Sequence, residues 1–578
     1  MKKIITVCLV ALCFYNTIMA QTKNVKLRII ETTDVHGCFF PYDFVKHEAK
    51  SGSLARVITY VDSLRQHYGK NLLLLENGDI LQGQPACYYS NYVDPGQENV
   101  AAKVVNYMKY DAQVIGNHDV ETGHEVYDKW IREVNCPVLG ANIIDTNTGE
   151  PYLKPYQMFE RDGVRIAVIG MLTPTIPYWL SENLWSELRF DDIAISAKKW
   201  VEYVKTHENP HLVIGLFHTG YDGGIATDEC RENAALQVAR EIPGFDAILY
   251  GHDHVNHCEV VKNSEGKDVL LLNPSSDAYF VGDVEIELTL KDGKVTRRMI
   301  SGKTHDIRKQ EIDKAFMKKF DREIKDVKKY VDHKIGTFKE AAYTRDSYFG
   351  NSAFSDFIHT FQLKRTHADI SFNAPLTYDT CIPAGDVRIS DLFNLYKYEN
   401  QLYVMELTGR EILGFLEMSY NLWINTMESP DSHIMQMNSI IKNGKKRYFF
   451  KNLAFNFDSA VGIDYEVDVT CPHGERVNIL KMSDGAPFEL DKTYKVAMNS
   501  YRGNGGGEML TIGAGIPHQE LKERIIWESD YDQRQGLCEW IEELGEYTPQ
   551  AMNNWKFVPE EWTAQAIERD RKLLFPNC

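Results

Sequence analysis

The chain has 578 residues, which at roughly 150 residues per domain suggests three to four domains or two large ones. The 64 Lys and Arg residues against 82 Asp and Glu residues give a formal net charge of −18, which argues against duplex nucleic acid as the main partner. With 43% hydrophobic and 25% charged residues, the composition is that of a globular protein and excludes disorder, collagen and a disulfide miniprotein.

The N-terminus has the pattern of a secretory signal. Lys2 and Lys3 form a basic region, residues 4–12 are apolar, and Ala20 places a small residue before Gln21. We expect cleavage after Ala20 and a periplasmic or secreted mature protein. No later uninterrupted apolar run reaches about 18 residues, so the sequence predicts no integral membrane span.

Residues 25–301 alternate short apolar runs with amphipathic stretches. Apolar runs separated by amphipathic helices are typical of strands buried on both faces of a layered α/β domain. We predict strands at residues 27–30, 72–75, 164–169, 212–217 and 247–250, and helices at 54–67, 100–110, 193–206 and 234–242.

The remaining chain divides into a connection and a second domain. Charged residues with helical spacing at 312–331 predict a solvated connecting helix, and beyond residue 344 a helix at 411–420 and a strand at 494–498 indicate a mixed domain. The expected division is a signal peptide at 1–20, a first domain at 21–310, a linker helix at 311–343, a second domain at 344–548 and a tail at 549–578. Nine cysteines lie outside the signal without a C-x-x-C pair, which argues against a structural zinc site.

Polar residues follow five of the apolar runs, directly where each run ends. Because ligands of an open α/β sheet bind outside the carboxyl ends of its strands, we expect these side chains to line one rim. The motifs are T-T-D-V-H-G at 32–37, N-G-D at 77–79, G-N-H-D at 116–119, H-T-G at 218–220 and G-H-D-H at 251–254.

These motifs supply mixed nitrogen and oxygen donors without a thiolate, which suits Zn, Mn, Fe, Ni or Co. Seven donors are too many for one ion, whereas two ions that share a bridging carboxylate fit the number. Two ions about 3.5–4 Å apart clamp the attacking and leaving oxygens of a displacement at phosphorus, so the sequence predicts a two-metal hydrolase of phosphate esters. The seven donors are Asp34, His36, Asp79, Asn117, His218, His252 and His254.

The ordered set D-x-H, G-D, G-N-H-[DE], H-x-G and G-H-x-H resembles the calcineurin-like metallophosphoesterases. The resemblance implies a layered α/β sandwich with two divalent ions, such as Zn, Mn or Co, bridged by Asp79. It implies that His118 stabilises the transition-state phosphoryl oxygen or assists the leaving group, and Glu121 stands where an acidic residue orients that histidine. The implied ligand sets are Asp34, His36, Asp79 and His254 for the first ion, and Asp79, Asn117, His218 and His252 for the second.

The second half is similar to the C-terminal domain of the periplasmic 5′-nucleotidase family. The similarity rests on N-S-Y-R-G-N-G-G-G at 499–507 and F-N-F-D at 455–458, and it implies an α+β domain in which Phe455 and Tyr501 hold the base. Asn499 and Arg502 of the same motif are further candidates for substrate binding. E-T-T-D at 31–34, N-A-P at 373–375 and P-A-G at 383–385 resemble the 2′,3′-cyclic-nucleotide 2′-phosphodiesterase/3′-nucleotidase branch.

We therefore expect an exported phosphoesterase whose partner is a small nucleotide and whose metal-bound hydroxide attacks phosphorus. The first alternative is a 5′-nucleotidase, although N-A-P-L at 373–376 stands where that group has G-G-x-R. A thiosulfohydrolase-like hydrolase and a non-catalytic nucleotide-binding protein are further alternatives, and the intact set of seven donors argues against the last. Metal identity, base preference and oligomeric state stay open.

Overall fold

The structure is a computed structural model that describes residues 22–442 and 444–576. The predicted signal peptide at 1–20 lies outside the described residues. Within the described part of the chain, no helix is long and apolar enough to cross a lipid bilayer. The eight cysteines found there are all free thiols.

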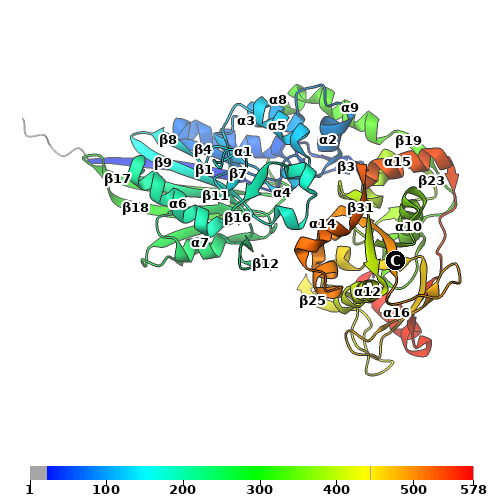
Figure 1. Ribbon diagram of the computed structural model, residues 1–578. Helices are drawn as coiled ribbons and strands as arrows, with labels where there is room; N and C mark the ends of the chain where they lie inside the picture. Colours follow the sequence, from blue (N-terminus) through cyan, green and yellow to red (C-terminus); the bar gives the residue numbers. More distant parts are fainter. Residues whose placement is uncertain (1–21, 443, 577–578) are drawn as a thin grey trace, which may run out of the picture.

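The first domain is built on two six-stranded sheets that pack face to face (Figure 1). In both sheets the central strands are parallel, and antiparallel strands form one edge of the first sheet and both edges of the second. The first sheet has the order β18-β17-β1-β4-β5-β6, with β1 at Thr22–Thr32, β4 at Leu72–Asn77, β5 at Ala112–Val114, β6 at Val138–Leu139, β17 at Phe280–Lys291 and β18 at Lys294–Asp306. The second has the order β15-β16-β14-β11-β9-β8, with β8 at Tyr156–Arg161, β9 at Val164–Leu172, β11 at Leu212–His218, β14 at Ala247–Tyr250, β15 at Asn256–Lys262 and β16 at Asp268–Pro274.

Three apolar layers hold these sheets and their helices together. Leu27 and Ile29 of β1 face the other sheet, whereas Ile30 faces the helices, because successive side chains of a strand point to opposite sides. β4 and β11 are buried along their whole length, which explains why their sequences are nearly continuous apolar runs. The predicted layered α/β sandwich is confirmed. The covering helices are α1 (Leu54–Tyr68), α3 (Val100–Met108) and α5 (His124–Glu133) on the first sheet, and α6 (Ile193–His207) and α7 (Ala235–Glu241) on the second.

The connection between the domains forms two helices, α8 (Lys314–Lys319) and α9 (Asp321–Val331). Only one side of them is solvated, because Phe316, Phe320 and Val331 are fully buried against the first domain. The connection is therefore anchored to the sandwich and is not a free linker.

The second domain is centred on a five-stranded sheet covered on both faces. Val496 and Met498 of β30 pack toward α12 (Gly409–Trp423), while Ala497 packs toward α10 (Ala353–Thr366). The sheet order is β27-β21-β30-β24-β31, with bounds Ser459–Val461, Ile370–Asn373, Thr493–Asn499, Gln401–Thr408 and Ile525–Asp532. Around it lie β19 (Lys334–Phe338), β23 (Gly385–Arg388), β32 (Glu546–Tyr547), β28 (Ile463–Asp468), β29 (Val477–Met482), α11 (Ile389–Leu395), α13 (Ser500–Gly503), α14 (Leu521–Arg524) and α15 (Gln533–Leu544).

The C-terminal tail is part of this second domain. Its strand β33 (Trp555–Val558) pairs in parallel with β28, and its helix α16 (Glu560–Leu574) buries Ala566 and Leu574 in the same apolar cluster as α12.

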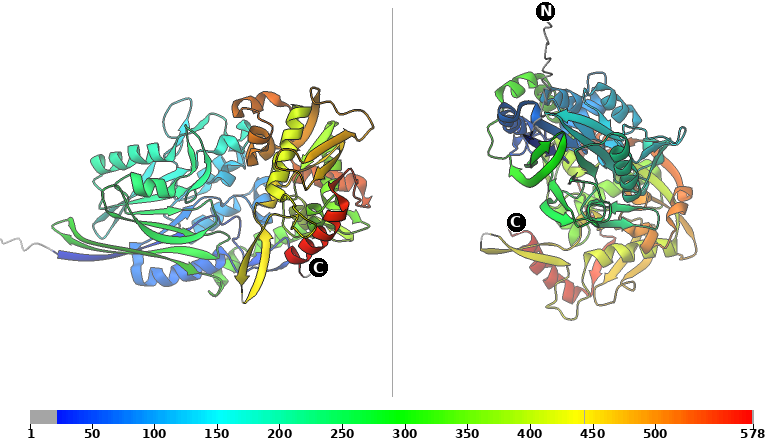
Figure 2. Two further views of the ribbon diagram at one scale, coloured as in Figure 1. Left: turned by 90° about the horizontal axis from the view of Figure 1, so that it is seen from below. Right: turned by 90° about the vertical axis from the view of Figure 1, so that its left-hand side faces the viewer.

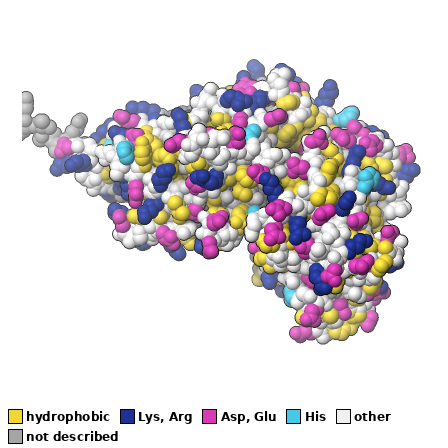
Figure 3. Space-filling model, viewed as in Figure 1, with side chains coloured by type: hydrophobic (Ala, Val, Ile, Leu, Met, Phe, Trp, Pro, Cys, Tyr) yellow, Lys and Arg dark blue, Asp and Glu magenta, His cyan; other side chains and the backbone are white. Residues whose placement is uncertain are grey.

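The two domains meet along one side of each, as the views in Figures 1 and 2 show. Tyr88 of helix α2 (Pro85–Tyr88) is buried in an apolar cluster of the second domain, and its hydroxyl donates to Asp532 at 3.0 Å. The guanidinium of Arg534 lies over the Tyr88 ring, 4.9 Å from its centroid. On the face seen in Figure 3, acidic and basic side chains are intermixed across both domains.

Candidate active site

The predicted donors lie at or just after the ends of β1, β4, β5, β11 and β14, and the structure brings them to one edge of the sandwich. A left-handed backbone is unusual for residues other than glycine and costs about 1–3 kcal/mol each, so it clusters where function needs it. Five of the seven donors have it, with φ of 50° at Asp34, 47° at His36, 59° at Asp79, 72° at His252 and 57° at His254.

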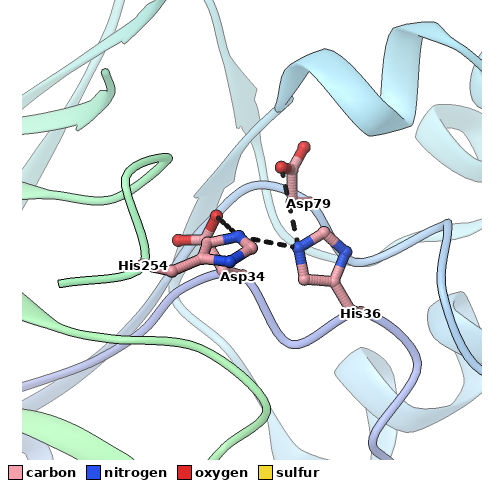
Figure 4. A group of neighbouring side chains, drawn as sticks. All are labelled: Asp34, His36, Asp79 and His254. Carbon is pink, nitrogen blue, oxygen red and sulfur yellow. Dashed lines mark hydrogen bonds and ion pairs between the residues drawn. The ribbon is translucent and has the colours of Figure 1, made fainter. Parts of the chain in front are cut away.

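Four of the donors form one compact group (Figure 4). One ligand atom from each of Asp34, His36, Asp79 and His254 lies within 4.8 Å of the others. His254 Nε2 is 3.2 Å from Asp34 Oδ1 and 3.0 Å from His36 Nε2, and His36 Nε2 is 3.9 Å from Asp79 Oδ2. These four side chains are the set expected for the first ion.

The other three donors converge beside Asp79. The Asn117 Oδ1 atom lies 3.1 Å from His218 Nε2 and 2.8 Å from His252 Nδ1. His218 Nε2 is in turn 3.2 Å from Asp79 Oδ2. Asp79 therefore borders both groups, which is the position that a bridging carboxylate requires.

The donor set fits a pair of divalent cations. Asp79 Oδ2 is buried and makes no hydrogen bond within the described residues, although histidine nitrogens of both groups surround it. A buried charged oxygen without a hydrogen bond is costly unless a cation or a donor satisfies it. Nitrogen and carboxylate donors are those that Zn, Mn and Co accept.

The protonation states of these donors depend on burial and on their neighbours. Burial lowers the pKa of His36 to about 4, so its ring is neutral, as a metal ligand must be. Burial opposes ionisation of Asp34, but His254 and His218 outweigh it and lower the pKa of Asp34 to about 2. Asp34 is therefore an anionic ligand across the physiological range.

Asp119 belongs to the G-N-H-D motif, which assigned it no role, and it joins the loop after β4 to the loop after β5. Its carboxylate accepts four backbone N–H groups, those of Asp79 (2.9 Å), Ile80 (2.8 Å), Leu81 (2.7 Å) and Gly116 (2.8 Å). A Cβ at Gly116 would lie 2.2 Å from Asp79 Oδ1, so only glycine fits beside this ligand. The G-N-H-D motif thus fixes the position of Asp79 as well as supplying Asn117.

The ring nitrogens that face away from the metal groups are also bonded. His36 Nδ1 lies 3.1 Å from the Gln82 carbonyl oxygen, and His218 Nδ1 lies 2.6 Å from the Asn77 carbonyl oxygen. A donor nitrogen fixed in this way leaves the other nitrogen free to bind metal.

His252 differs, because its Nε2 lies 3.0 Å from a carboxylate, that of Glu232. Glu232 belongs to strand β13 (Arg231–Asn233) of a hairpin that follows β11, and its other oxygen accepts the backbone N–H of Ile225 at 2.7 Å. No sequence motif marks this residue. Only the fold of the hairpin brings it to the site.

His118 stands beside the metal groups without joining them. Its backbone N–H donates to Asp79 Oδ1 at 2.8 Å, and its ring lies 5.4 Å from the His36 ring. Its Nδ1 donates to Glu121 Oε2 at 2.6 Å, and among the described residues Nε2 has no hydrogen-bond partner. Burial lowers the pKa of His118, but Asp79 and Glu121 outweigh it and raise the pKa to about 9, so the ring holds a proton at neutral pH.

Phe455 and Tyr501 lie next to each other in the second domain. Their ring centroids are 6.2 Å apart and the rings are nearly perpendicular, at 87°. In this arrangement the rings contact each other, so one of them must turn before a base can lie between two parallel rings. A Cβ at Gly506 would come within 2.5 Å of the Tyr501 ring, which explains one glycine of this loop.

Arg502 and Asn499 are placed to support this pair of rings. The Arg502 guanidinium is 1% exposed and donates to Asp458 Oδ2 at 2.7 Å and to the Phe455 carbonyl oxygen at 2.9 Å. Asn499 caps α13 by accepting the backbone N–H of Arg502 at 2.7 Å. Both side chains thus make hydrogen bonds within the domain that hold the loop in position.

The loop that carries Tyr501 faces the metal side of the first domain. The Trp179 ring lies 5.5 Å from the His252 ring, and the Trp179 carbonyl oxygen accepts from the Asn504 side chain at 3.5 Å. The Glu121 carboxylate accepts from the Asn400 side chain of the second domain at 3.4 Å. The Tyr501 loop and the candidate metal donors therefore border the same region between the two domains.

Two family models match the chain. Residues 27–256 match the calcineurin-like phosphoesterase model, and residues 334–512 match the model of the 5′-nucleotidase C-terminal domain. The first match spans all seven candidate metal donors, and the second contains Phe455 and Tyr501.

Relatives match over nearly the whole chain. The trifunctional nucleotide phosphoesterase protein YfkN of Bacillus subtilis is 28% identical over 94% of this chain, which spans 40% of that longer protein. The 2′,3′-cyclic-nucleotide 2′-phosphodiesterase/3′-nucleotidase of Yersinia enterocolitica is 26% identical, with 96% of this chain and 92% of the relative covered. Protein UshA of Escherichia coli is 24% identical, with 84% and 86% covered.

Solved structures share the fold. A candidate 5′-nucleotidase from Staphylococcus aureus, in complex with alpha-ketoglutarate, superposes with a TM-score of 0.76 at 20% identity, covering 92% of this chain and 100% of that chain. The 5′-nucleotidase precursor from Thermus thermophilus has a TM-score of 0.63 at 21% identity, covering 93% and 100%.

Proposed function

We propose that this chain, which matches the family models of the calcineurin-like phosphoesterases and of the 5′-nucleotidase C-terminal domain, is an exported 2′,3′-cyclic-nucleotide 2′-phosphodiesterase and 3′-nucleotidase. Metal-dependent hydrolysis of phosphoric esters is common to this family. The ribose position, the two-ion stoichiometry and the export of the protein are the proposed parts.

The observation that carries this function is the position of the Tyr501 loop against the metal side of the first domain. Two cations bound by the seven donors would activate a water and neutralise charge on the phosphoryl oxygens. His118 holds a proton beside this group and is placed to donate it to the leaving ribose oxygen. Glu121 fixes the His118 ring so that Nε2 faces the reaction.

The 2′,3′ preference is supported by the chemistry of the ribose. The cyclic 2′,3′-phosphate and the 3′-phosphate lie on the same edge of the sugar, so a nucleotide bound by its base presents either ester to one site. A 5′-phosphate lies on the other side of the ring. Three relatives named for 2′,3′-cyclic and 3′ substrates match 94–96% of this chain at 25–26% identity.

The 5′-nucleotidase alternative shares the same metal site and must be separated by substrate. We would measure phosphate release from 2′,3′-cAMP, 3′-AMP, 5′-AMP and bis(p-nitrophenyl) phosphate, with and without chelator. The proposal expects cleavage of the first two nucleotides, loss of all activity on chelation and recovery with Mn or Co. Preferential release from 5′-AMP would assign the alternative, and full activity in a metal-free preparation would refute both.

A further inference from the structure

A two-stranded hairpin extends from the second domain beside helix α16 (Figure 2). Its strands are β25 (Met437–Lys442) and β26 (Lys445–Phe450). The base is anchored, because Phe450 is 7% exposed and its ring lies 4.6 Å from that of Tyr348. Toward the tip, almost every described side chain is exposed.

The tip carries an unusual concentration of positive charge. Four cations occur within six positions of a chain whose net charge is −18, and no acidic residue lies among them. Within the described residues, none of the four makes an ion pair with a carboxylate. The four cations are Lys442, Lys445, Lys446 and Arg447.

Large apolar side chains flank these cations. Ile441 is 81% exposed, Ile440 is 50% exposed and Phe449 is 39% exposed. Ile441 stands opposite Lys446 and Ile440 opposite Arg447 across the ladder, so each apolar side chain has a cation beside it on the same face. None of the three belongs to a described apolar cluster.

The charge on the tip argues against pairing with a second copy of the chain. An exposed strand edge can pair with another edge, but two such tips would bring four cations against four, and lysine on an edge strand opposes such pairing. Charges more than about 8 Å apart are largely screened at physiological salt, so acidic residues of the body weaken an attraction at the tip only where they lie close to it.

We propose that this hairpin tip binds the surface of an anionic phospholipid membrane. The four cations would lie at the lipid phosphates while Ile441 and its neighbours enter the boundary between headgroups and acyl chains. Basic residues that alternate with exposed aliphatic side chains are the composition of interfacial membrane-binding segments. The binding would hold the enzyme at a membrane through the hairpin tip, and it does not depend on the proposed substrate.

The test is sedimentation of the full chain with vesicles of phosphatidylcholine alone and with vesicles that also contain phosphatidylglycerol. We expect binding only to the anionic vesicles, with weakening at high salt. K445E/K446E should weaken this binding about tenfold or more, and I441S should weaken it without changing its salt dependence.

The matched control is K294E/R297E on the hairpin β17–β18, an equal charge change at exposed positions of the first domain. This control should bind within about twofold of the unaltered protein. All variants should hydrolyse bis(p-nitrophenyl) phosphate at the unaltered rate, which shows that they are folded. Absence of vesicle binding would overturn the proposal, as would equal loss in the control. Binding of single-stranded RNA by the same tip without binding of vesicles would also overturn it.

Discussion

Replacement of His118 by alanine tests whether the site separates metal binding from proton transfer. The His118 ring makes no hydrogen bond with a candidate ligand atom among the described residues. The contact with Asp79 is made by the backbone N–H of His118, at 2.8 Å. Alanine keeps this backbone contact. We therefore expect H118A to bind metal as the unaltered protein does.

The rate should fall because one transition-state donor is lost. Removing one such donor costs about 10²–10³ in kcat, or about 2.7–4 kcal/mol. The assay is steady-state hydrolysis of 2′,3′-cAMP together with metal content by mass spectrometry. If metal content falls in parallel with the rate, His118 is a ligand and the assigned role is wrong.

The pH dependence provides a second measure of the same residue. The active form is protonated His118, so activity should be lost as pH rises through its pKa, which Asp79 and Glu121, outweighing burial, raise to about 9. Bound cations would neutralise part of the charge on Asp79, so the alkaline limb of the pH–rate profile should lie at lower pH when metal is bound. E121Q removes the second carboxylate and should move the alkaline limb further down, whereas H118A should abolish it. An alkaline limb that is identical in E121Q would contradict the pairing.

Four other substitutions test the remaining parts of the site. D79A should lower metal content at both positions, measured per chain after dialysis, and unchanged content would exclude a bridge. E232A removes the carboxylate on His252 and should weaken metal binding about 10–100-fold in a titration, with E232D closer to the unaltered protein. Y501A should cost nucleotide substrates about 1–3 kcal/mol in kcat/KM but spare bis(p-nitrophenyl) phosphate, and equal losses would make Tyr501 a structural residue. R502M leaves the buried Asp458 unpaired and should cost about 3–5 kcal/mol of stability in denaturant unfolding, and a smaller loss would show that this ion pair is dispensable.

The donor positions could be predicted from sequence because each depends on one strand and the turn after it. The apolar runs at 72–75 in β4 and 212–217 in β11 each end at polar residues, so the motifs at these ends predict Asp79 and His218 as donors. The left-handed backbone at Asp34 and His36 could not be predicted from the sequence, because neither the residue types nor their spacing indicates it.

Contacts between distant segments could not be predicted. Glu232 reaches His252 only because the hairpin after β11 folds back over the site, and Asn400 reaches Glu121 only because the domains close on each other. The roles of Arg502 and Asn499 likewise depend on burial. A sequence motif shows that an arginine is present, but not that its guanidinium forms a buried ion pair with Asp458.

A competition assay between two nucleotides shows which ester of the ribose the enzyme hydrolyses faster. Equal concentrations of 2′,3′-cAMP and 5′-AMP in one reaction are consumed in the ratio of their kcat/KM values, which chromatography of the nucleotides measures. We expect 2′,3′-cAMP to be consumed at least about tenfold faster than 5′-AMP, equivalent to about 1.4 kcal/mol of transition-state binding. Faster consumption of 5′-AMP would contradict it.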